Sequence, residues 1–163
     1  MAGQDVPVFE HRYPVWDDDA PVFTWPSDTA VATDWWGHYL ANAGFEDDAP
    51  PVRDTTQSEE AAADLVDRLA ESGDPRAVPL LLAIAEAAPD REALFFLGAG
   101  PLEDLFRAHG DEFAPKLVAA AKGSNRFKIA LSGVWPDRDA PLSERAMTML
   151  TPYLGDDETT PLD

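Results

Sequence analysis

The 163-residue chain contains no cysteine, and this absence excludes several kinds of site at once. Without thiols there is no disulfide framework, thiolate zinc site, iron–sulfur cluster or cysteine nucleophile. Long hydrophobic runs are also missing, since no stretch approaches the roughly 20 apolar residues needed to cross a bilayer. Residues 1–5 lack the basic and apolar segments of a secretory signal. We therefore expect a cytoplasmic protein without a membrane partner.

Basic residues are scarce: 12 Lys and Arg stand against 31 Asp and Glu, for a net charge of −19. A nucleic-acid binder needs a dense basic patch, and the chain has none, so we expect no nucleic-acid partner. The same charge attracts a basic protein and speeds its encounter. Acidity of this kind also suits solubility in a salt-adapted or high-GC organism. Charge alone leaves both interpretations open.

The first 57 residues differ in composition from the rest, because they hold four of the five tryptophans and many prolines. Residues 6–16 and 21–26 form two aromatic-rich runs on either side of an acidic turn at Asp17, Asp18 and Asp19. Prolines interrupt both runs, which predicts an extended arm or a small edge β-hairpin. A short helix over 34–43, capped by Thr33 or Asp34, and a proline-containing linker complete this region.

From residue 58 onward, helix caps, apolar stripes and glycine or proline stops recur at short intervals. They predict helices over 58–73, 75–88, 91–97, 101–110, 112–122, 125–135 and 144–154. Ser58 and Ser143 are the expected N-terminal caps of the first and the last of these helices. The expected fold is mainly α, a compact bundle or a short HEAT-like stack of about seven short helices. The expected organisation is an N-terminal arm and short helix (1–57), a helical domain (58–155) and an acidic flexible tail (156–163).

The glycines in Gly98-Ala99-Gly100-Pro101 are typical of a phosphate-binding loop, but the surrounding spacing is not. Glu103 stands where the third glycine of that motif belongs, and its charge repels phosphate. We expect the glycines to allow a sharp turn and close helix packing instead.

Glu103 and Asp104 are the strongest candidates for acid–base chemistry, and the spacing argues against it. Adjacent helical residues diverge by about 100° around the axis, so the two carboxylates do not converge on one atom. Arg107 lies four and three residues later, which predicts intrahelical ion pairs. His109 precedes Gly110, a position typical of a C-terminal cap. The other histidines and the acidic turn lack metal-ligand spacing, so we predict no catalytic, cofactor or metal site.

Trp35 and Trp36 occupy adjacent positions of the expected short helix, so we expect that the two rings do not both face the same core. An exposed ring near the acidic residues would be a plausible anchor for a basic partner. In the alternative interpretation, which we favour, both rings hold the arm against the helices. The partner-binding hypothesis rests on Asp17, Asp18, Asp19, Trp35, Trp36, Glu46, Asp47 and Asp48.

Residues 60–135 carry a recognisable set of motifs. They include Ala88-Pro89-Asp90, the box from Gly98 to Leu105, the step His109-Gly110, and Phe127, Ala130, Leu131, Val134 and Trp135. These motifs resemble a bacterial family, domain of unknown function 6869. The resemblance implies a helical domain of bacterial origin and carries no activity. The motif residues with an expected structural role are Gly98, Gly100, Pro101, Glu103, Asp104, His109, Gly110 and Trp135.

The functional expectation is an acidic protein-binding module, most concretely an immunity-type or inhibitor protein that neutralises a basic toxin or nuclease. A helical regulatory or scaffold domain, whose acidity serves only solvation, is the alternative. An enzyme with a carboxylate site at Glu103 and Asp104 ranks third.

Overall fold

The computed structural model describes residues 26–42, 51–136, 142–155 and 159–162. These residues are mainly helical, and there is no strand among them. In chain order the helices are α1 (Asp28–Ala41), α2 (Gln57–Ser72), α3 (Ala77–Glu86), α4 (Arg91–Leu97), the π-helical turn η2 (Gly98–Leu102), α5 (Glu103–Gly123), α6 (Asn125–Ser132), α7 (Glu144–Leu150) and the 3-10 turn η3 (Thr151–Tyr153). The arm or hairpin expected over residues 6–26 lies outside the described residues, apart from Pro26.

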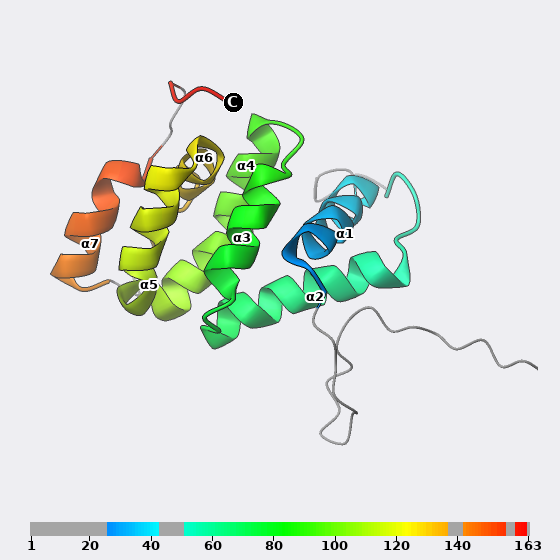
Figure 1. The fold of residues 1–163 in the computed structure, drawn as a ribbon, viewed down its shortest axis with the longest axis horizontal. Coiled ribbons are helices and arrows are strands. Elements are labelled where there is room, and N and C mark those ends of the chain that lie inside the picture. Colours follow the sequence, from blue (N-terminus) through cyan, green and yellow to red (C-terminus); the bar gives the residue numbers. More distant parts are fainter. Residues whose placement is uncertain (1–25, 43–50, 137–141, 156–158, 163) are drawn as a thin grey trace, which may run out of the picture.

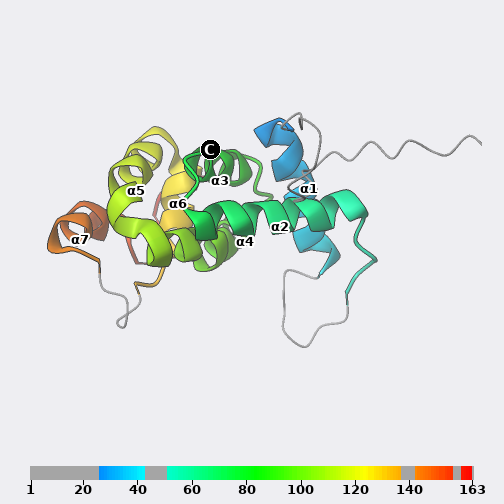
Figure 2. The ribbon, with the colours of Figure 1, turned by 90° about the horizontal axis from the view of Figure 1, so that it is seen from below.

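The helices form a row with α1 near one end and α7 at the other (Figure 1). Helix α1 packs on α2 and α3, α4 packs on α6, and α5 contacts α2, α6 and α7. Seen from below, α2 runs along one face of the row (Figure 2). One continuous set of buried apolar residues extends from Val31 on α1 to Leu150 on α7. Helix α1 therefore contributes to the same core as the helices that follow it.

Helix α1 begins earlier than the sequence pattern predicts. The Ser27 hydroxyl accepts a hydrogen bond from the Ala30 amide (3.2 Å), and Asp28 opens the helix, so the cap lies before Thr33 and Asp34. Thr33 lies inside the helix and donates to the Thr29 carbonyl (2.9 Å). A helix that is capped by Ser27 has Asp28 in its first turn, where a negative charge is favourable, and this favours Ser27 as the cap.

Helix α2 starts at a reciprocal capping box. The Thr56 hydroxyl accepts from the Glu59 amide (3.3 Å), and the Glu59 carboxylate accepts from the Thr56 amide (2.8 Å). The expected cap at Ser58 is wrong, because the pair Thr56 and Glu59 satisfies two amides at once. At the other end, Gly73 adopts a left-handed conformation (φ +66°) and ends the helix as predicted.

Helix α3 begins after a turn. The Asp74 carboxylate accepts from the Arg76 amide (2.9 Å), so Pro75 lies in that turn and the helix starts at Ala77. Helix α4 confirms the predicted span, with the Asp90 carboxylate accepting from Ala93 (2.8 Å).

The helix that was expected to end at Gly110 does not end there, and the chain shows a kink at this place instead. Helix α4 passes through η2 into α5, and α5 continues beyond His109, whose backbone is non-helical (φ −139°, ψ 16°). Leu105 before the kink and Phe113 after it are both fully buried. The helix resumes because both halves place apolar residues in the same core.

The C-terminal region combines a confirmed helix with a docked segment. Ser143 caps α7 as predicted, through a 3.2 Å bond from the Ala146 amide. Thr160 is buried, and it accepts hydrogen bonds from Lys128 (2.7 Å) on its hydroxyl and from Arg91 on its carbonyl. This docking arises because two cationic donors satisfy the polar groups of Thr160.

Candidate protein-interaction surface

The glycine-rich box is a packing element, as the sequence predicts. A Cβ atom on Gly98 would collide with the Ala130 carbonyl oxygen and lie 2.9 Å from the Gly133 Cα atom. Both contacts are backbone, so only glycine lets the start of η2 approach the end of α6 this closely. A Cβ atom on Gly100 would meet no atom within 4 Å. Gly100 provides the non-helical residue between α4 and α5, and Pro101 after it is buried.

Glu103 and Asp104 form the predicted ion pairs. Arg107 donates to Glu103 Oε1 at 2.6 Å and to Asp104 Oδ1 at 3.0 Å. The second oxygen of Glu103 accepts from the Trp135 amide at 3.3 Å. Both Glu103 oxygens therefore have structural partners, which connect the first turn of α5 to the chain leaving α6.

His109 caps a helix end, but not the end of its own helix. Its Nε2 atom bonds the Glu71 carbonyl oxygen (2.7 Å), in the last turn of α2. A Cβ atom on Gly73 would lie 2.8 Å from the His109 ring, so glycine makes room for this contact. Gly110, the next residue, is buried against Leu142. The sequence shows a capping histidine, but only the fold shows which helix it caps.

Trp35 and Trp36 are both buried, with 4% and 5% of their surface exposed. The expectation that the two rings do not both face one core is wrong, because α1 packs on α2 and α3 and also contacts Phe96 of α4. Trp36 Nε1 donates to the Ile84 carbonyl (2.8 Å), and Trp35 lies 6.1 Å from the Phe96 ring centre. Adjacent helical positions can both be buried when neighbouring helices cover two sides of one helix. The rings are therefore core residues and not surface anchors.

The remaining residues of the partner-binding hypothesis lie outside the described residues. They are Asp17, Asp18, Asp19, Glu46, Asp47 and Asp48. Their role stays a prediction.

An acidic stripe that the sequence interpretation missed follows the outer face of α2. Its members are spaced at i, i+4, i+7 and i+11, directly opposite the buried Leu65 and Leu69, and all are exposed: Glu60, Asp64, Asp67 and Glu71. This spacing places them on one helix face. The spacing of these four acidic residues is visible in the sequence, but only the apolar stripe of the same helix was used to predict it.

Asp67 lies at the centre of this stripe. The pKa of Asp67 is raised, first by partial desolvation and then by the like charges of Asp104, Glu71 and Asp64. The charge of His38 acts in the opposite direction and lowers this pKa. The carboxylates of α2 thus act on one another and on the first turn of α5. We call these five residues, Glu60, Asp64, Asp67, Glu71 and Asp104, the acidic face.

Trp135 is a further surface feature. The sequence places it at the end of a helix, where an apolar ring is expected to pack, yet 70% of the residue is exposed. Its backbone is held by the bond from its amide to Glu103. The exposed aromatic residue of this protein is therefore Trp135 and not Trp35 or Trp36, among the residues that the structure describes.

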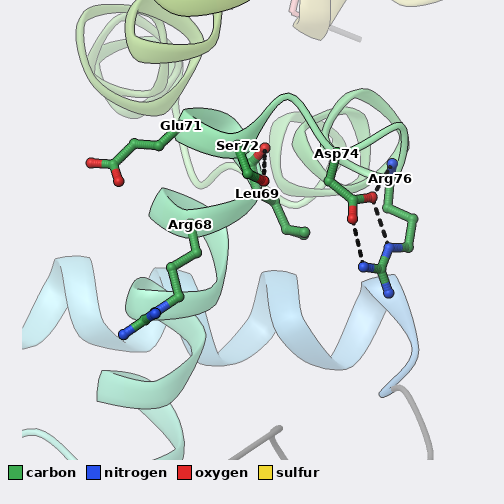
Figure 3. Close-up of a pocket in the computed structure, with 6 residues that line it drawn as sticks. All are labelled: Arg68, Leu69, Glu71, Ser72, Asp74 and Arg76. Carbon is green, nitrogen blue, oxygen red and sulfur yellow. Dashed lines mark hydrogen bonds and ion pairs between the residues drawn. The ribbon is translucent and has the colours of Figure 1, made fainter. Parts of the chain in front are cut away.

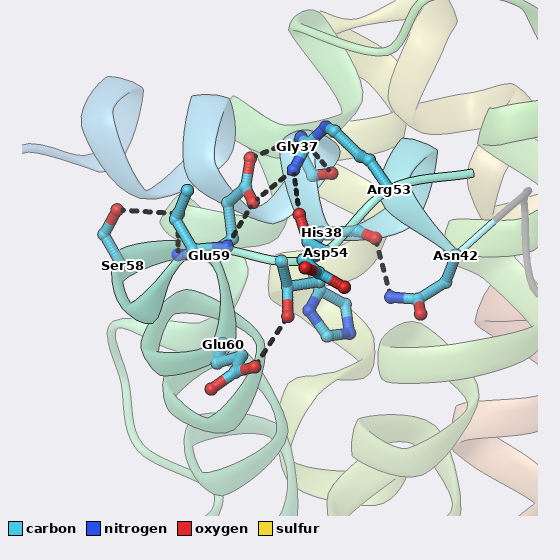
Figure 4. Close-up of polar contacts among 10 residues, drawn as sticks. Gly37, His38, Asn42, Arg53, Asp54, Ser58, Glu59 and Glu60 are labelled. Atoms are coloured by element: carbon cyan, nitrogen blue, oxygen red, sulfur yellow. Dashed lines mark hydrogen bonds and ion pairs between the residues drawn. The ribbon is translucent and has the colours of Figure 1, made fainter. Parts of the chain in front are cut away.

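The junction of α1 and α2 holds a clamp around Glu59. Arg53 donates to both Glu59 oxygens (2.7 and 2.9 Å) and to the Gly37 carbonyl (3.1 Å), as Figure 4 shows. The Arg53 hydrogen bond and that from the Thr56 amide lower the pKa of Glu59 to about 2. A Cβ atom on Gly37 would collide with the Glu59 carboxylate, so a larger residue there would displace this carboxylate from its present position. The clamp is structural and holds the two helices together.

A surface hollow of about 470 Å³ lies at the end of α2 (Figure 3). Arg76 donates to both Asp74 oxygens there (2.8 and 2.6 Å), and Arg68 and Glu71 extend away from that pair. The side chains do not converge on a common point, so the hollow does not form a catalytic arrangement.

Within 26–42, 51–136, 142–155 and 159–162, no group of three or more His, Asp and Glu is placed to hold a metal ion. In the same ranges, every helix is too short or too polar to cross a membrane.

Comparison with known proteins places the chain in a family. Neither a curated protein nor a solved structure matches it. The profile of one family matches residues 51–146, which include α2, the glycine box, α5, α6 and Trp135. The resemblance inferred from the box at Gly98–Leu105 is thereby confirmed at the level of the family. The chain belongs to DUF6869, a family of unknown function.

Proposed function

We propose that this protein is an acidic protein-binding module that uses the acidic face to hold a basic partner. The most concrete form of the proposal is an immunity-type or inhibitor protein that neutralises a basic toxin or nuclease. The observation that carries it is the stripe Glu60, Asp64, Asp67 and Glu71, whose four carboxylates share one exposed helix face.

The acidic face is supported by a rigid helix. Five buried residues of α2 anchor it in the core: Ala62, Leu65, Val66, Leu69 and Ala70. The capping box at one end and the His109 contact at the other hold both ends of that helix. A partner therefore meets charges whose backbone is already ordered, which lowers the entropic cost of binding. Clustered charge of one sign also steers an oppositely charged partner and speeds association.

The wider setting belongs to the same proposal. We place the protein in the cytoplasm of a bacterium, with the helices forming a short HEAT-like stack. In such a stack, one long face of a helix row is open to a partner. The position of α2 along one face of the helix row (Figure 2) supports the proposal that this face is open to a partner.

The test begins with affinity capture from the native host at low and at high salt. The wild-type protein is compared with a double variant that carries both Asp64→Asn and Asp67→Asn. The control is the single variant Glu144→Gln, which removes one charge from α7. The captured protein is then purified, and its toxic or nuclease activity is measured with and without the acidic protein.

The proposal requires a basic partner that is retained at low salt, released at high salt and lost by the double variant alone. It also requires inhibition of the partner's activity. Capture that is equal for all variants and insensitive to salt would instead favour the regulatory or scaffold domain. Absence of any retained protein at low salt would contradict the proposal.

A further inference from the structure

We propose that the binding surface includes Trp135, and that its occupant is a helical segment of the partner carrying arginines along one face. This inference rests on the proposed function and deepens it, because it adds an apolar anchor and states the chemistry of the bound segment.

Trp135 has a fixed backbone and a free ring. Val134, directly before it, is 2% exposed, and the Trp135 amide donates to Glu103 Oε2. The side chain nevertheless leaves the core, with 70% of the residue exposed. Exposing an indole to water costs hydrophobic free energy that a partner recovers by covering it. Tryptophans in such positions are among the most frequent hot spots of protein interfaces.

Helix α5, which packs on α2, links Trp135 to the acidic face. Its amide bonds Glu103, Glu103 and Asp104 share Arg107, and Asp104 acts electrostatically on Asp67 at the centre of the stripe. Trp135 therefore adjoins the first turn of α5, which contributes Asp104 to the acidic face.

Arginine fits this combination better than lysine. A guanidinium group is planar, so it stacks on an indole and at the same time donates in a fork to a carboxylate. The ammonium group of lysine is compact and strongly hydrated, and it pairs with a carboxylate as a point charge.

The spacing of the stripe indicates the shape of the occupant. The rise from Glu60 to Glu71 is about 16 Å, at the helical rise per residue. The carboxylates repeat with the helical period along this length, which matches cations repeated on one face of a second helix. The occupant is therefore a basic helix of about three turns, aligned with α2.

The experiment uses two synthetic amphipathic helical peptides as probes, identical except that one carries arginines and the other lysines on the polar face. Their affinities are measured at low salt for the wild type, Trp135→Ala, Trp135→Phe and Asp64→Asn, Asp67→Asn. Val52→Ala is the matched control, because Val52 is equally exposed (72%) but belongs to the chain between α1 and α2. Circular dichroism and thermal unfolding verify that each variant is folded.

We expect the wild type to bind the arginine peptide more tightly than the lysine peptide. Trp135→Ala should weaken binding of the arginine peptide about tenfold and remove the preference, whereas Val52→Ala should behave as the wild type. The difference in emission between the wild type and Trp135→Phe reports on Trp135. This signal should shift to the blue and become protected from acrylamide when the arginine peptide binds.

The failures of the two proposals are distinguishable. If the double variant loses binding while Trp135→Ala retains full affinity and preference, this inference is overturned and the acidic face stands as the partner site. If the wild type binds neither peptide at low salt, the proposed function fails together with the inference.

Discussion

The Nε2 atom of His109 lies 2.7 Å from the carbonyl oxygen of Glu71, and this contact ties the kink of α5 to the last turn of α2. Glu71 is also the last residue of the acidic stripe. The hydrogen bond therefore fixes the position of α2 relative to α5, the two helices that contribute to the acidic face.

Replacing His109 tests this connection. His109→Ala leaves a C-terminal carbonyl of α2 without its protein donor, so we expect a loss of about 1 kcal/mol in the free energy of unfolding. His109→Gln retains a side-chain donor and should lose less. Denaturant unfolding at neutral pH measures both. Equal stability of His109→Ala and the wild type would show that the contact contributes nothing.

Gly98→Ala tests the close packing of η2 on α6. The added methyl group meets only backbone atoms, of Ala130 and Gly133, so the two segments must separate. We expect a destabilisation of about 1–3 kcal/mol, the usual cost of overpacking a core. Gly123→Ala is the control, since nothing lies within 4 Å of its added Cβ. Thermal or denaturant unfolding measures the free energy of unfolding of both variants. Similar free energies for Gly98→Ala and Gly123→Ala would contradict the packing role of Gly98.

The clamp between Arg53 and Glu59 predicts a pH dependence. The pKa of Glu59 is lowered from 4.5 to about 2, so its stabilising contribution is complete above 4.5 and disappears as the pH falls toward 2. Glu59→Gln preserves the capping box but loses the charge for Arg53. The variant should be less stable than the wild type at neutral pH, and the difference should shrink in that acid range. A difference that stays constant down to pH 2 would exclude this origin.

Asp67 predicts the opposite effect. Its raised pKa means that the folded protein holds the proton more tightly than the unfolded chain, so the ionised form costs stability above the unfolded pKa. Asp67→Asn should therefore raise the free energy of unfolding at neutral pH by a few tenths of a kcal/mol, about the size of a like-charge helix pair. The gain should shrink as salt is added. Destabilisation at low salt would contradict the repulsion described for the stripe.

The local signals in the sequence are those that the structure reproduces best. Ser143 caps the helix that it was expected to cap, and Gly73 ends α2 as expected, because each works through bonds within a few residues. The ion pairs of Arg107 follow from helix spacing for the same reason.

Features that depend on neighbouring helices were not predictable in this way. The burial of Trp35 and Trp36 requires α2, α3 and α4 on two sides of α1, and no local pattern shows those neighbours. The carbonyl that His109 contacts is 38 residues away in sequence. The exposure of Trp135 is equally invisible in the chain, where a tryptophan at a helix end is more often packed.

The central claim is that the acidic face binds a basic protein, and the salt dependence of that binding tests it most directly. The dissociation constant of the complex with the captured basic partner is measured across a range of salt concentrations for the wild type and for Asp64→Asn, Asp67→Asn. We predict that salt weakens the wild-type complex steeply, and that the double variant binds more weakly at low salt with a shallower dependence. Identical affinities and slopes for the two proteins would contradict the account.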